Sequence, residues 1–525
     1  MKKSTGYKLG IILVCFMSNL TLLKAQVLTS AQIDDLTERT LKTFDVPGIA
    51  VAVVKDGKIF HAKGYGVSSL TTHKKVDENT LFGIASNSKA FTCAALAILV
   101  DEGKIKWDDK VIQYIPDFKM YNTYVTEEFT IRDLLTHRSG LGLGAGDLML
   151  WPDQSQFSID DIIHNLRYLK PVSDFRTKFD YDNLLYIVAG EVVHKVSGKN
   201  WDQFIEERIF QPLQMDNSRA SLNRVKNTSN LIDAHAPIDG KVQVIERYKN
   251  PIIDAAGGIY SSVADLSKWA ILQMNDGKYG DQLEKQLFSK KEHYEMWAPQ
   301  TIMPSYTTPP YNTHFSAYGL GWFLSDVKGY KQVTHTGGLE GMVTQVTLIP
   351  ELKLGIIVLT NQQVGAAFNA VTNTIKNGYL GIDPIDYVTL YASRVKTNTD
   401  EANKITKEVW ETIEKERKNN TKKTDNTKII GTYKDNWLGE ITISNKKGKL
   451  WFDAKKSPRL SGEVFFYKDN TYIVKWTNRS YDADAYMEFT FDEKGNGSTI
   501  KMKPISPLTD FSYDFQDLDF TRVNN

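Results

Sequence analysis

The chain has 525 residues, of which 41% are hydrophobic and 24% charged, and its formal net charge is +1. These values exclude wholesale disorder, because disordered chains have fewer apolar residues and more net charge. The near-neutral charge argues against nucleic acid as a partner, and two cysteines cannot form a disulfide framework. The length predicts a globular protein of two to four domains, with the composition of an enzyme.

Residues 1–25 are predicted to form a signal peptide. Three lysines give a positive start, residues 9–23 are mostly apolar, and Ala25 is a small residue before a cut at Gln26. The apolar stretch is short for crossing about 30 Å of hydrocarbon, so an uncleaved signal anchor is the weaker alternative. Val14-Cys15 is a poor lipoprotein site because valine is large, although a lipid anchor stays open. We therefore expect a bacterial protein that is periplasmic or secreted, with no membrane span after cleavage.

The next segment, residues 26–395, predicts an α/β (α+β) domain. A helical pattern follows Ser30, and strand patterns at 46–54 and 58–65 are joined by Asp56-Gly57, which favours a tight antiparallel hairpin. A second pair of strand patterns lies at 342–350 and 353–359. The strong patterns between these pairs are mostly helical. We therefore expect an antiparallel sheet flanked by helices, with a helical insert.

The composition changes after about residue 395. Residues 396–428 predict a charged helical linker, and residues 429–525 predict a small antiparallel β-barrel. Turn residues separate the strand patterns of this last domain, which lie at 440–444, 449–452, 464–467, 472–476 and 486–491.

Ser86 and Lys89 form a Ser-x-x-Lys motif directly before an apolar helical pattern at 90–100. One helical turn separates them, so their side chains share a face, and the positive end of the helix dipole favours an alkoxide at Ser86. Lysine, with a reference pKa of about 10.4, needs burial to act as a base near neutral pH; otherwise its cation could lower the pKa of a second base. The motif alone is weak, because a serine at a helix start is usually an N-cap. It also recurs at Ser325, Ser393, Ser444 and Ser498.

Two further patterns supply candidate partners for this pair. Tyr181-Asp182-Asn183 precedes an apolar helical pattern, and a nearby lysine cation would lower the phenol pKa of about 10. The same spacing recurs at Tyr248-Lys249-Asn250, so a solvent-facing turn is the alternative. His335-Thr336-Gly337-Gly338 follows a strand pattern. Glycines on an edge strand let a substrate approach and leave an amide free to donate; a sheet edge softened by glycine is the plain alternative.

In this order the three motifs resemble those of serine hydrolases of the class C β-lactamase, DD-peptidase and esterase superfamily, which are penicillin-binding-protein-like. Their pattern is Ser-x-x-Lys, Tyr-x-Asn, then Lys-Thr-Gly or His-Thr-Gly. The resemblance covers about residues 30–380. It includes flanking stretches at 134–141, 211–215, 256–262 and the strand ending at Asn361. The C-terminal domain is similar, more loosely, to the lipocalin-like barrels that some members carry.

The resemblance implies an exported serine hydrolase that cleaves small amide or ester substrates through an acyl-enzyme. Ser86 would be the nucleophile, and Lys89 with Tyr181 would handle its proton. The amides of Ser86 and Gly338 would form the oxyanion hole. Asn183 would contact the acyl side of the substrate.

His335 is the departure from the family pattern that matters. The resemblance puts it on the leaving-group side, with Thr336 among the substrate-binding residues, where β-lactamases and DD-peptidases mostly carry a lysine that holds a substrate carboxylate. Histidine is mostly neutral at pH 7. We therefore expect weak β-lactam hydrolysis and a preference for D-amino-acid peptides or esters.

Other readings stay open. A catalytically silent cell-wall-binding protein of the same fold is the alternative function, although retention of Ser86, Lys89, Tyr181 and Asn183 argues against it. We expect no cofactor and no metal, since no two histidines have zinc-pair spacing, and the sequence does not decide the oligomeric state or the exact substrate. Three other features have plainer interpretations. We expect His137 to hold the loop at 138–140 in place and Cys93 to be a small buried residue. The glycine-rich run 142–146 lacks the strand-then-helix context of a dinucleotide site.

Overall fold

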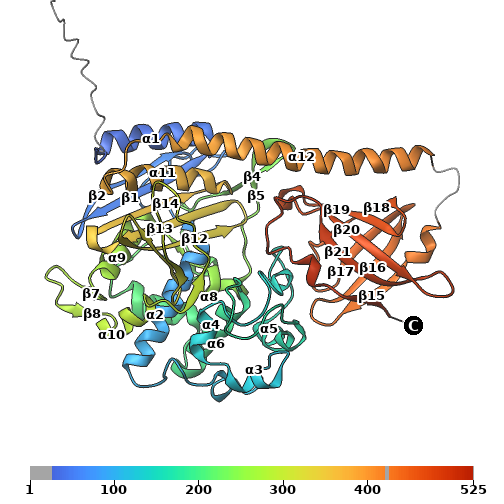
Figure 1. Cartoon of the computed structure of the whole chain (residues 1–525), viewed down its shortest axis with the longest axis horizontal. Helices are drawn as coiled ribbons and strands as arrows, with labels where there is room; N and C mark the ends of the chain where they lie inside the picture. Colours follow the sequence, from blue (N-terminus) through green and yellow to red (C-terminus); the bar gives the residue numbers. More distant parts are fainter. Residues whose placement is uncertain (1–25, 420–424, 524–525) are drawn as a thin grey trace, which may run out of the picture.

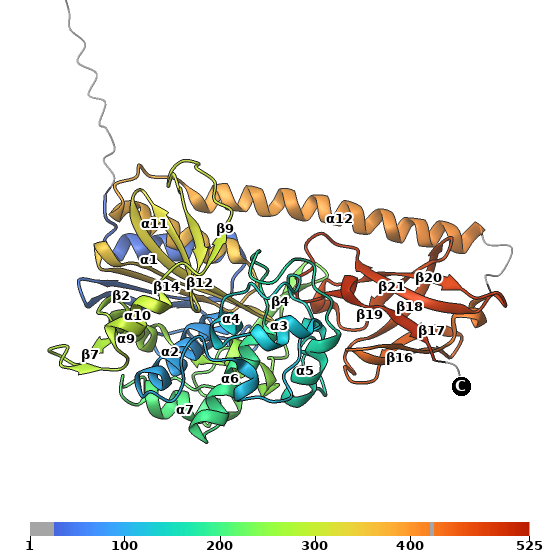
Figure 2. The ribbon, with the colours of Figure 1, turned by 60° about the horizontal axis from the view of Figure 1, so that its bottom comes forward.

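The computed structural model describes residues 26–419 and 425–523 (Figure 1). The predicted signal peptide lies outside the described residues. A larger N-terminal domain and a C-terminal barrel lie side by side, and one long helix runs along both (Figures 1 and 2). Among the described helices, none is long and apolar enough to cross a membrane.

The N-terminal domain is built on an eight-stranded antiparallel sheet with the order β2-β1-β14-β13-β12-β11-β10-β9. Both predicted hairpins are confirmed, and the first turns through Asp56 and Gly57, whose φ angles are 52° and 75°. The strands are β1 (Gly48–Lys55), β2 (Lys58–Gly66), β9 (Thr301–Met303), β10 (Ser316–Tyr318), β11 (Phe323–Val327), β12 (Tyr330–Leu339), β13 (Met342–Ile349) and β14 (Leu354–Thr360).

Helices cover both faces of this sheet (Figure 1). Side chains of β1 alternate between the faces, so Val51 and Val53 pack towards α1 and α11 while Ala50 and Ala52 belong to the core that contains α2. The first face carries α1 (Ser30–Thr43), α11 (Gly365–Tyr379) and the start of α12 (Tyr387–Asn419). The remaining helices are α2 (Ser88–Asp101), α3 (Thr123–Glu128), α4 (Ile131–Leu135), α5 (Ile159–Asn165), α6 (Leu184–Ser197), α7 (Trp201–Ile205), α8 (Asp254–Gly257), α9 (Val263–Met274) and α10 (Lys290–Met296).

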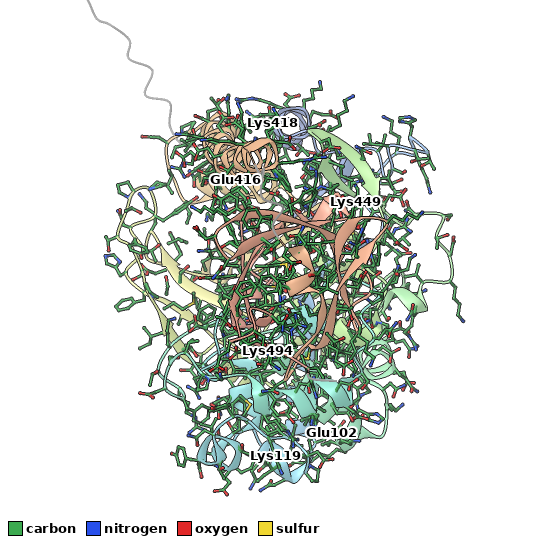
Figure 3. The ribbon with its side chains drawn as sticks, turned by 90° about the vertical axis from the view of Figure 1, so that its right-hand side faces the viewer. Glu102, Lys119, Glu416, Lys418, Lys449 and Lys494 are labelled. Atoms are coloured by element: carbon green, nitrogen blue, oxygen red, sulfur yellow. The ribbon has the colours of Figure 1, made fainter. Side chains whose placement is uncertain are left out.

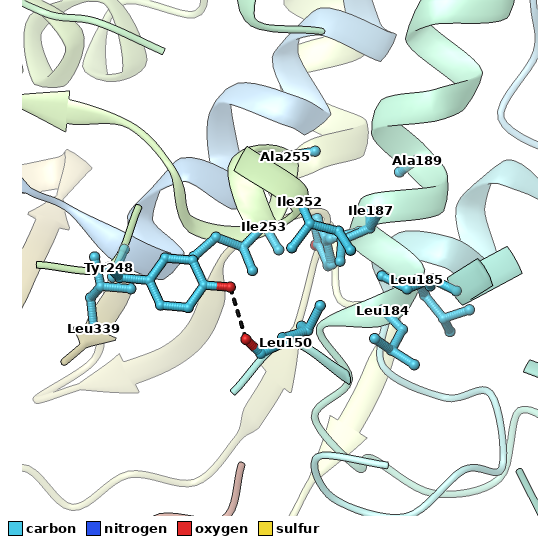
Figure 4. Packing of buried hydrophobic residues seen from close by; sticks show 14 of the residues in the cluster. Leu150, Leu184, Leu185, Ile187, Ala189, Tyr248, Ile252, Ile253, Ala255 and Leu339 are labelled. Atoms are coloured by element: carbon cyan, nitrogen blue, oxygen red, sulfur yellow. Dashed lines mark hydrogen bonds between the residues drawn. The ribbon is translucent and has the colours of Figure 1, made fainter. Parts of the chain in front are cut away.

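The helical insert packs around α2, α6 and α8. Tyr248 lies beside Ile253 and Leu339 in this core, and its hydroxyl donates to the carbonyl oxygen of Leu150 at 2.9 Å (Figure 4). Three small strand pairs occur at its borders: β3 (Phe82–Gly83) with β6 (Tyr260–Ser261), β4 (Ala234–Ile238) with β5 (Lys241–Ile245), and β7 (Lys278–Tyr279) with β8 (Lys285–Gln286).

Strand β12 is an edge along only part of its length. Its first half pairs with β11 as far as Thr334 opposite Phe323, whereas residues 335–339 pair with β13 alone. The expected edge strand is therefore an inner strand that becomes an edge at His335. This free half-edge holds the glycines.

The C-terminal domain is a closed eight-stranded barrel. All five predicted strands are present, and three more close the barrel at its start and end. Buried aromatic residues such as Phe452 and Trp476 fill its interior, as expected for a barrel of eight strands. The strands are β15 (Gly431–Asp435), β16 (Gly439–Lys446), β17 (Lys449–Ala454), β18 (Ser461–Lys468), β19 (Thr471–Trp476), β20 (Ala485–Phe491), β21 (Gly497–Pro504) and β22 (Phe520–Arg522).

Helix α12 joins the two domains over 33 residues. It begins before the predicted linker and packs on α11, and further on its Val409 and Ile413 lie in one apolar cluster with Ile473 of the barrel. Its outer face carries charged side chains, among them Glu416 and Lys418 (Figure 3). The charged pattern therefore belongs to an amphipathic helix with a buried stripe.

Candidate active site

Ser86 lies in a tight turn immediately before α2. The turn is a short 3₁₀ segment (Ala85–Asn87), and Ser86 is half-buried at its centre. Ala85 has a φ of 48°, a left-handed conformation that costs a non-glycine residue about 1–3 kcal/mol. Strain of this kind persists only where the surroundings fix the backbone.

Strand β12 supplies much of that fixation through Gly337. A Cβ atom at Gly337 would lie 2.2 Å from the carbonyl oxygen of Ile84 and 2.6 Å from Oγ1 of Thr344. Thr344 in turn donates to the Ile84 oxygen at 2.9 Å and accepts from Nδ2 of Asn87 at 2.9 Å. Gly337 is thus required for the close approach of the Ser86 turn to the strand.

Lys89 lies one helical turn after Ser86 and is fully buried. Its Nζ is 3.1 Å from Ser86 Oγ, 2.7 Å from Asn183 Oδ1 and 3.0 Å from the carbonyl oxygen of Ala256. Burial lowers the Lys89 pKa to about 7, although the carboxylates of Asp147 and Asp182 partly oppose this shift. Lys89 therefore exchanges its proton near neutral pH.

Asn183 connects Lys89 to the buried carboxyl group of Asp147, which belongs to none of the sequence motifs. While its Oδ1 accepts from Lys89, its Nδ2 donates to Oδ2 of Asp147 at 2.8 Å. Asp147 is fully buried, and burial raises its pKa well above the usual value. Asn183 thus lies between the lysine and an acid and holds the lysine in place.

Tyr181 places its ring over Lys89, with Nζ 4.7 Å from the ring centroid. Its hydroxyl is buried without a hydrogen-bond partner among the described residues, and burial raises its pKa, a shift that the Ser86 hydroxyl opposes. His137 packs against Tyr181 with ring centroids 4.1 Å apart and accepts the amide of Asp182 on Nδ1 at 3.0 Å. The side chain of His137 therefore holds the Tyr181 segment.

His335 is the first residue of the free half-edge of β12, and its side chain is buried. It is 1% exposed, and its Nε2 is 2.9 Å from the Tyr318 hydroxyl. Its Nδ1 is 2.6 Å from the Thr336 oxygen, which can only accept, so Nδ1 carries the proton and Nε2 accepts from Tyr318. Burial and the neighbouring Lys89 lower the His335 pKa to about 3. His335 is therefore neutral, while Thr336 and Gly338 face solvent on the other side of the strand.

The structure thus brings together residues from three distant stretches of the chain. Lys89 contacts both Ser86 and Asn183, and Tyr181 covers Lys89. Gly338 follows the glycine that lies against the Ser86 turn. Sequence reasoning missed the roles of Asp147 and of Gly337 in this arrangement. Among residues 26–419 and 425–523, no cluster of three or more His, Cys, Asp or Glu side chains could hold a metal ion.

The fold is that of a penicillin-binding-protein-like α/β domain followed by a closed barrel. The profile of the Beta-lactamase family matches residues 33–377, and that of a domain of unknown function, DUF3471, matches residues 415–522. The chain therefore belongs to the beta-lactamase family.

Curated relatives include hydrolases. An unguisins hydrolase of Aspergillus campestris is 31% identical over 340 residues, which cover 62% of this chain and 60% of the relative. The corresponding protein of Aspergillus violaceofuscus is 29% identical and is covered to 66%, with 68% of this chain aligned. Protein flp of Staphylococcus aureus strain MW2 is 28% identical, with coverages of 63% and 62%. The chain spans less than two thirds of the length of these relatives.

A solved structure shares the fold over nearly the whole chain. The octameric penicillin-binding protein homologue from Pyrococcus abyssi superposes with a TM-score of 0.58 and 20% identity, covering 94% of this chain and 99% of that one. This likeness is one of fold.

Proposed function

We propose that the protein is an exported serine hydrolase that cleaves small amide or ester substrates through an acyl-enzyme on Ser86. The observation that carries this proposal is the 3.1 Å contact between Lys89 Nζ and Ser86 Oγ, made by a fully buried lysine whose pKa is lowered to about 7. A nucleophile and a base within hydrogen-bond reach are the signature of covalent catalysis.

The contacts of Lys89 favour its neutral form as the base. A neutral amine has two N–H groups and one lone pair. Two fixed acceptors, Asn183 Oδ1 and the Ala256 oxygen, take the N–H groups, which leaves the lone pair directed at Ser86. The Ser86 hydroxyl can then pass its proton to Nζ as its oxygen attacks the substrate carbonyl.

Tyr181 suits the opposite role. Because burial raises its pKa, Tyr181 keeps its proton at neutral pH and can donate it to the leaving group, after which the Lys89 ammonium can reprotonate the phenol. Water then attacks the acyl-enzyme. The amides of Ser86 and Gly338 are the proposed oxyanion donors, and one such donor typically contributes about 2.7–4 kcal/mol to barrier lowering.

We propose substrates that do not depend on a carboxylate near β12. His335 is neutral and held by Tyr318, so it offers no cation at the position where a family lysine would bind such a group. Small esters and D-amino-acid peptides therefore fit better than β-lactams. The relatives named unguisins hydrolases support hydrolysis as the type of reaction.

The test is covalent labelling with a fluorophosphonate. We expect labelling of the wild-type protein that is lost in Ser86→Ala and kept in Ser444→Ala, the matched control from another Ser-x-x-Lys motif. A protein that stays unlabelled would instead be the silent binding protein.

Turnover of p-nitrophenyl esters, D-alanyl anilides and a chromogenic cephalosporin then ranks the substrates. Cephalosporin turnover equal to that of a class C β-lactamase would contradict the proposed preference. Detection of the mature chain only in the cytoplasm would contradict export.

A further inference from the structure

A loop of the C-terminal barrel reaches the active site of the N-terminal domain. This barrel loop (residues 505–514) ends at Asp514, which is fully buried. Asp514 accepts the amide of Gly146 on Oδ2 at 2.7 Å and the amide of Leu148 on Oδ1 at 3.0 Å. One barrel carboxyl group therefore binds the two amides that flank Asp147.

The glycine loop (residues 142–146) is shaped to receive the barrel loop. Gly144 has a φ of 71°, and a Cβ there would lie 2.8 Å from Cδ2 and from the carbonyl oxygen of Phe511. Gly146 also has a positive φ, 81°, which turns its amide towards Asp514. The contact between the two domains therefore explains Gly144, which leaves room for Phe511.

Phe511 lies beside Tyr181. Its ring centroid is 6.0 Å from that of Tyr181, with the planes at 77°. Phe511 remains 39% exposed, and Leu143 and Val172 are 46% and 61% exposed. These three side chains form the apolar part of a groove of about 320 Å³, whose rim also carries Lys178, Asp180 and Asp510. Such exposed apolar groups around a concave surface are typical of a ligand site.

Further contacts between the two domains hold the barrel loop in its position. Asn165 donates to the Trp437 oxygen at 2.9 Å, and Lys456 of the barrel pairs with Asp161 at 2.7 Å. Within the site, Asp147 contacts Asn183, and Asn183 contacts Lys89. The barrel loop is thus connected to the catalytic lysine by consecutive contacts.

We propose that Phe511 is a specificity-determining residue contributed by the barrel. With Leu143 and Val172 it forms a subsite for an apolar acyl chain, and Asp514 is the positioning residue that keeps it beside Tyr181. This inference rests on the proposed hydrolase function, in which Asn183 contacts the acyl side of the substrate. The partner of Asn183, Asp147, directly follows the glycine loop, so the acyl side lies towards the groove.

The test measures binding, so that it does not depend on turnover. In a Ser86→Ala background, calorimetry compares the affinities for p-nitrophenyl hexanoate and p-nitrophenyl acetate. Each methylene buried in an apolar site strengthens binding about fourfold, so we expect hexanoate to bind at least about tenfold more tightly in this partly open groove. Phe511→Ala should reduce the ratio below about threefold, and Phe511→Leu should keep most of it.

Two matched controls separate the subsite from general destabilisation. Leu508→Ala alters the same loop at a side chain that is 46% exposed and does not line the groove, and it should leave the ratio unchanged. Asp514→Asn should lower the ratio, whereas Asp435→Asn, which affects a buried carboxylate bonded to amides within the barrel, should lower only the melting temperature.

Equal affinities for the two esters in the Ser86→Ala protein, or an unchanged ratio in Phe511→Ala, would overturn the inference. A wild-type protein that shows the affinity ratio but no labelling of Ser86 would refute the proposed reaction and leave the subsite standing.

Discussion

Both domains bury carboxyl groups, but the surroundings of these groups differ. In the barrel, Asp435 accepts the amides of Trp437 and Leu438 on Oδ1, at 2.8 and 2.9 Å, and that of Asp519 on Oδ2. Around Ser86, by contrast, Asp147 Oδ1 and Asp182 Oδ2 are buried without hydrogen-bond partners among the described residues, as are the Tyr181 hydroxyl and His137 Nε2.

This difference separates buried polar groups that stabilise the fold from buried polar groups that can take part in a reaction. A fully bonded carboxylate stabilises a turn, and its loss affects folding. A cluster of incompletely bonded titratable groups around one nucleophile is a feature of functional sites, where perturbed pKa values concentrate. Paired substitutions, one in each kind of surrounding, can test this reading.

Lys89 and Lys376 form the pair with the largest expected contrast. Both lysines are buried, and burial lowers the pKa of each to about 7, but Lys376 lies on α11 with its Nζ 2.9 Å from Gln332 Oε1. Lys89→Ala removes the proposed base and should lower kcat/KM by about 10³–10⁴. Lys376→Met should change the melting temperature with less than about a threefold effect on kcat/KM. Similar activity losses in both variants would contradict the role of Lys89.

Tyr181 and Tyr248 share a Tyr-x-Asn spacing and give the next contrast. Tyr181→Phe should lower kcat by about 10²–10³, because it removes the proton donor while keeping the ring. Tyr248→Phe removes a hydrogen bond to the Leu150 oxygen. It should cost about 1 kcal/mol of unfolding free energy and leave kcat unchanged. Rapid-quench or steady-state assays with the best ester, alongside thermal melts, measure both effects.

Gly337 and Gly338 are adjacent but predicted to respond differently. Gly337→Ala places a methyl group against the Ile84 oxygen and displaces the Ser86 turn, so we expect a loss of about tenfold to a hundredfold in kcat/KM. Gly338→Ala has open space within 4 Å and keeps its amide, so its melting temperature should match that of the wild type. Equal melting temperatures for the two variants would show that the turn does not depend on Gly337.

The pH dependence gives the smallest and most specific effect. If neutral Lys89 is the base, kcat/KM should rise with pH through about 7 and then level off. The rise should be broad, because the Asp182 pKa is raised to about 7 and the two groups titrate together. The Asp182 carboxylate favours the lysine cation, so Asp182→Asn should lower the Lys89 pKa and shift the rise to lower pH by about one unit or less. Asp435→Asn is the control, and a shift to higher pH in Asp182→Asn would contradict the assignment.

Much of the fold could be predicted because its hairpins and helices are determined by residues close together in the sequence. The Asp56-Gly57 hairpin and the apolar helix after Ser86 depend on neighbouring residues alone. Strand β21, which was not predicted, also alternates: Ile500 and Met502 are buried and Lys501 and Lys503 are exposed, so its pattern is present in the sequence. By contrast, β15 and β22 are short and are defined by the partners they pair with.

The site was predictable only where a motif marked it. Ser86, Lys89, Tyr181 and Asn183 lie in recognisable patterns, but Asp147 has no motif, and its relation to Lys89 exists only after folding. Asp514 lies more than 360 residues from the amide of Gly146 that it binds. Contacts at such separations depend on how whole domains dock, which no local pattern encodes.

Helix α12 changes the thermodynamics of that docking. Its 33 residues extend about 50 Å, with its start on α11 and Val409 on the barrel. Docking of the barrel on the N-terminal domain is therefore an intramolecular step, and the barrel has an effective concentration on the order of millimolar at that surface. The contacts of Phe511 and Asp514 with the N-terminal domain can then be individually weak and still be formed nearly all the time.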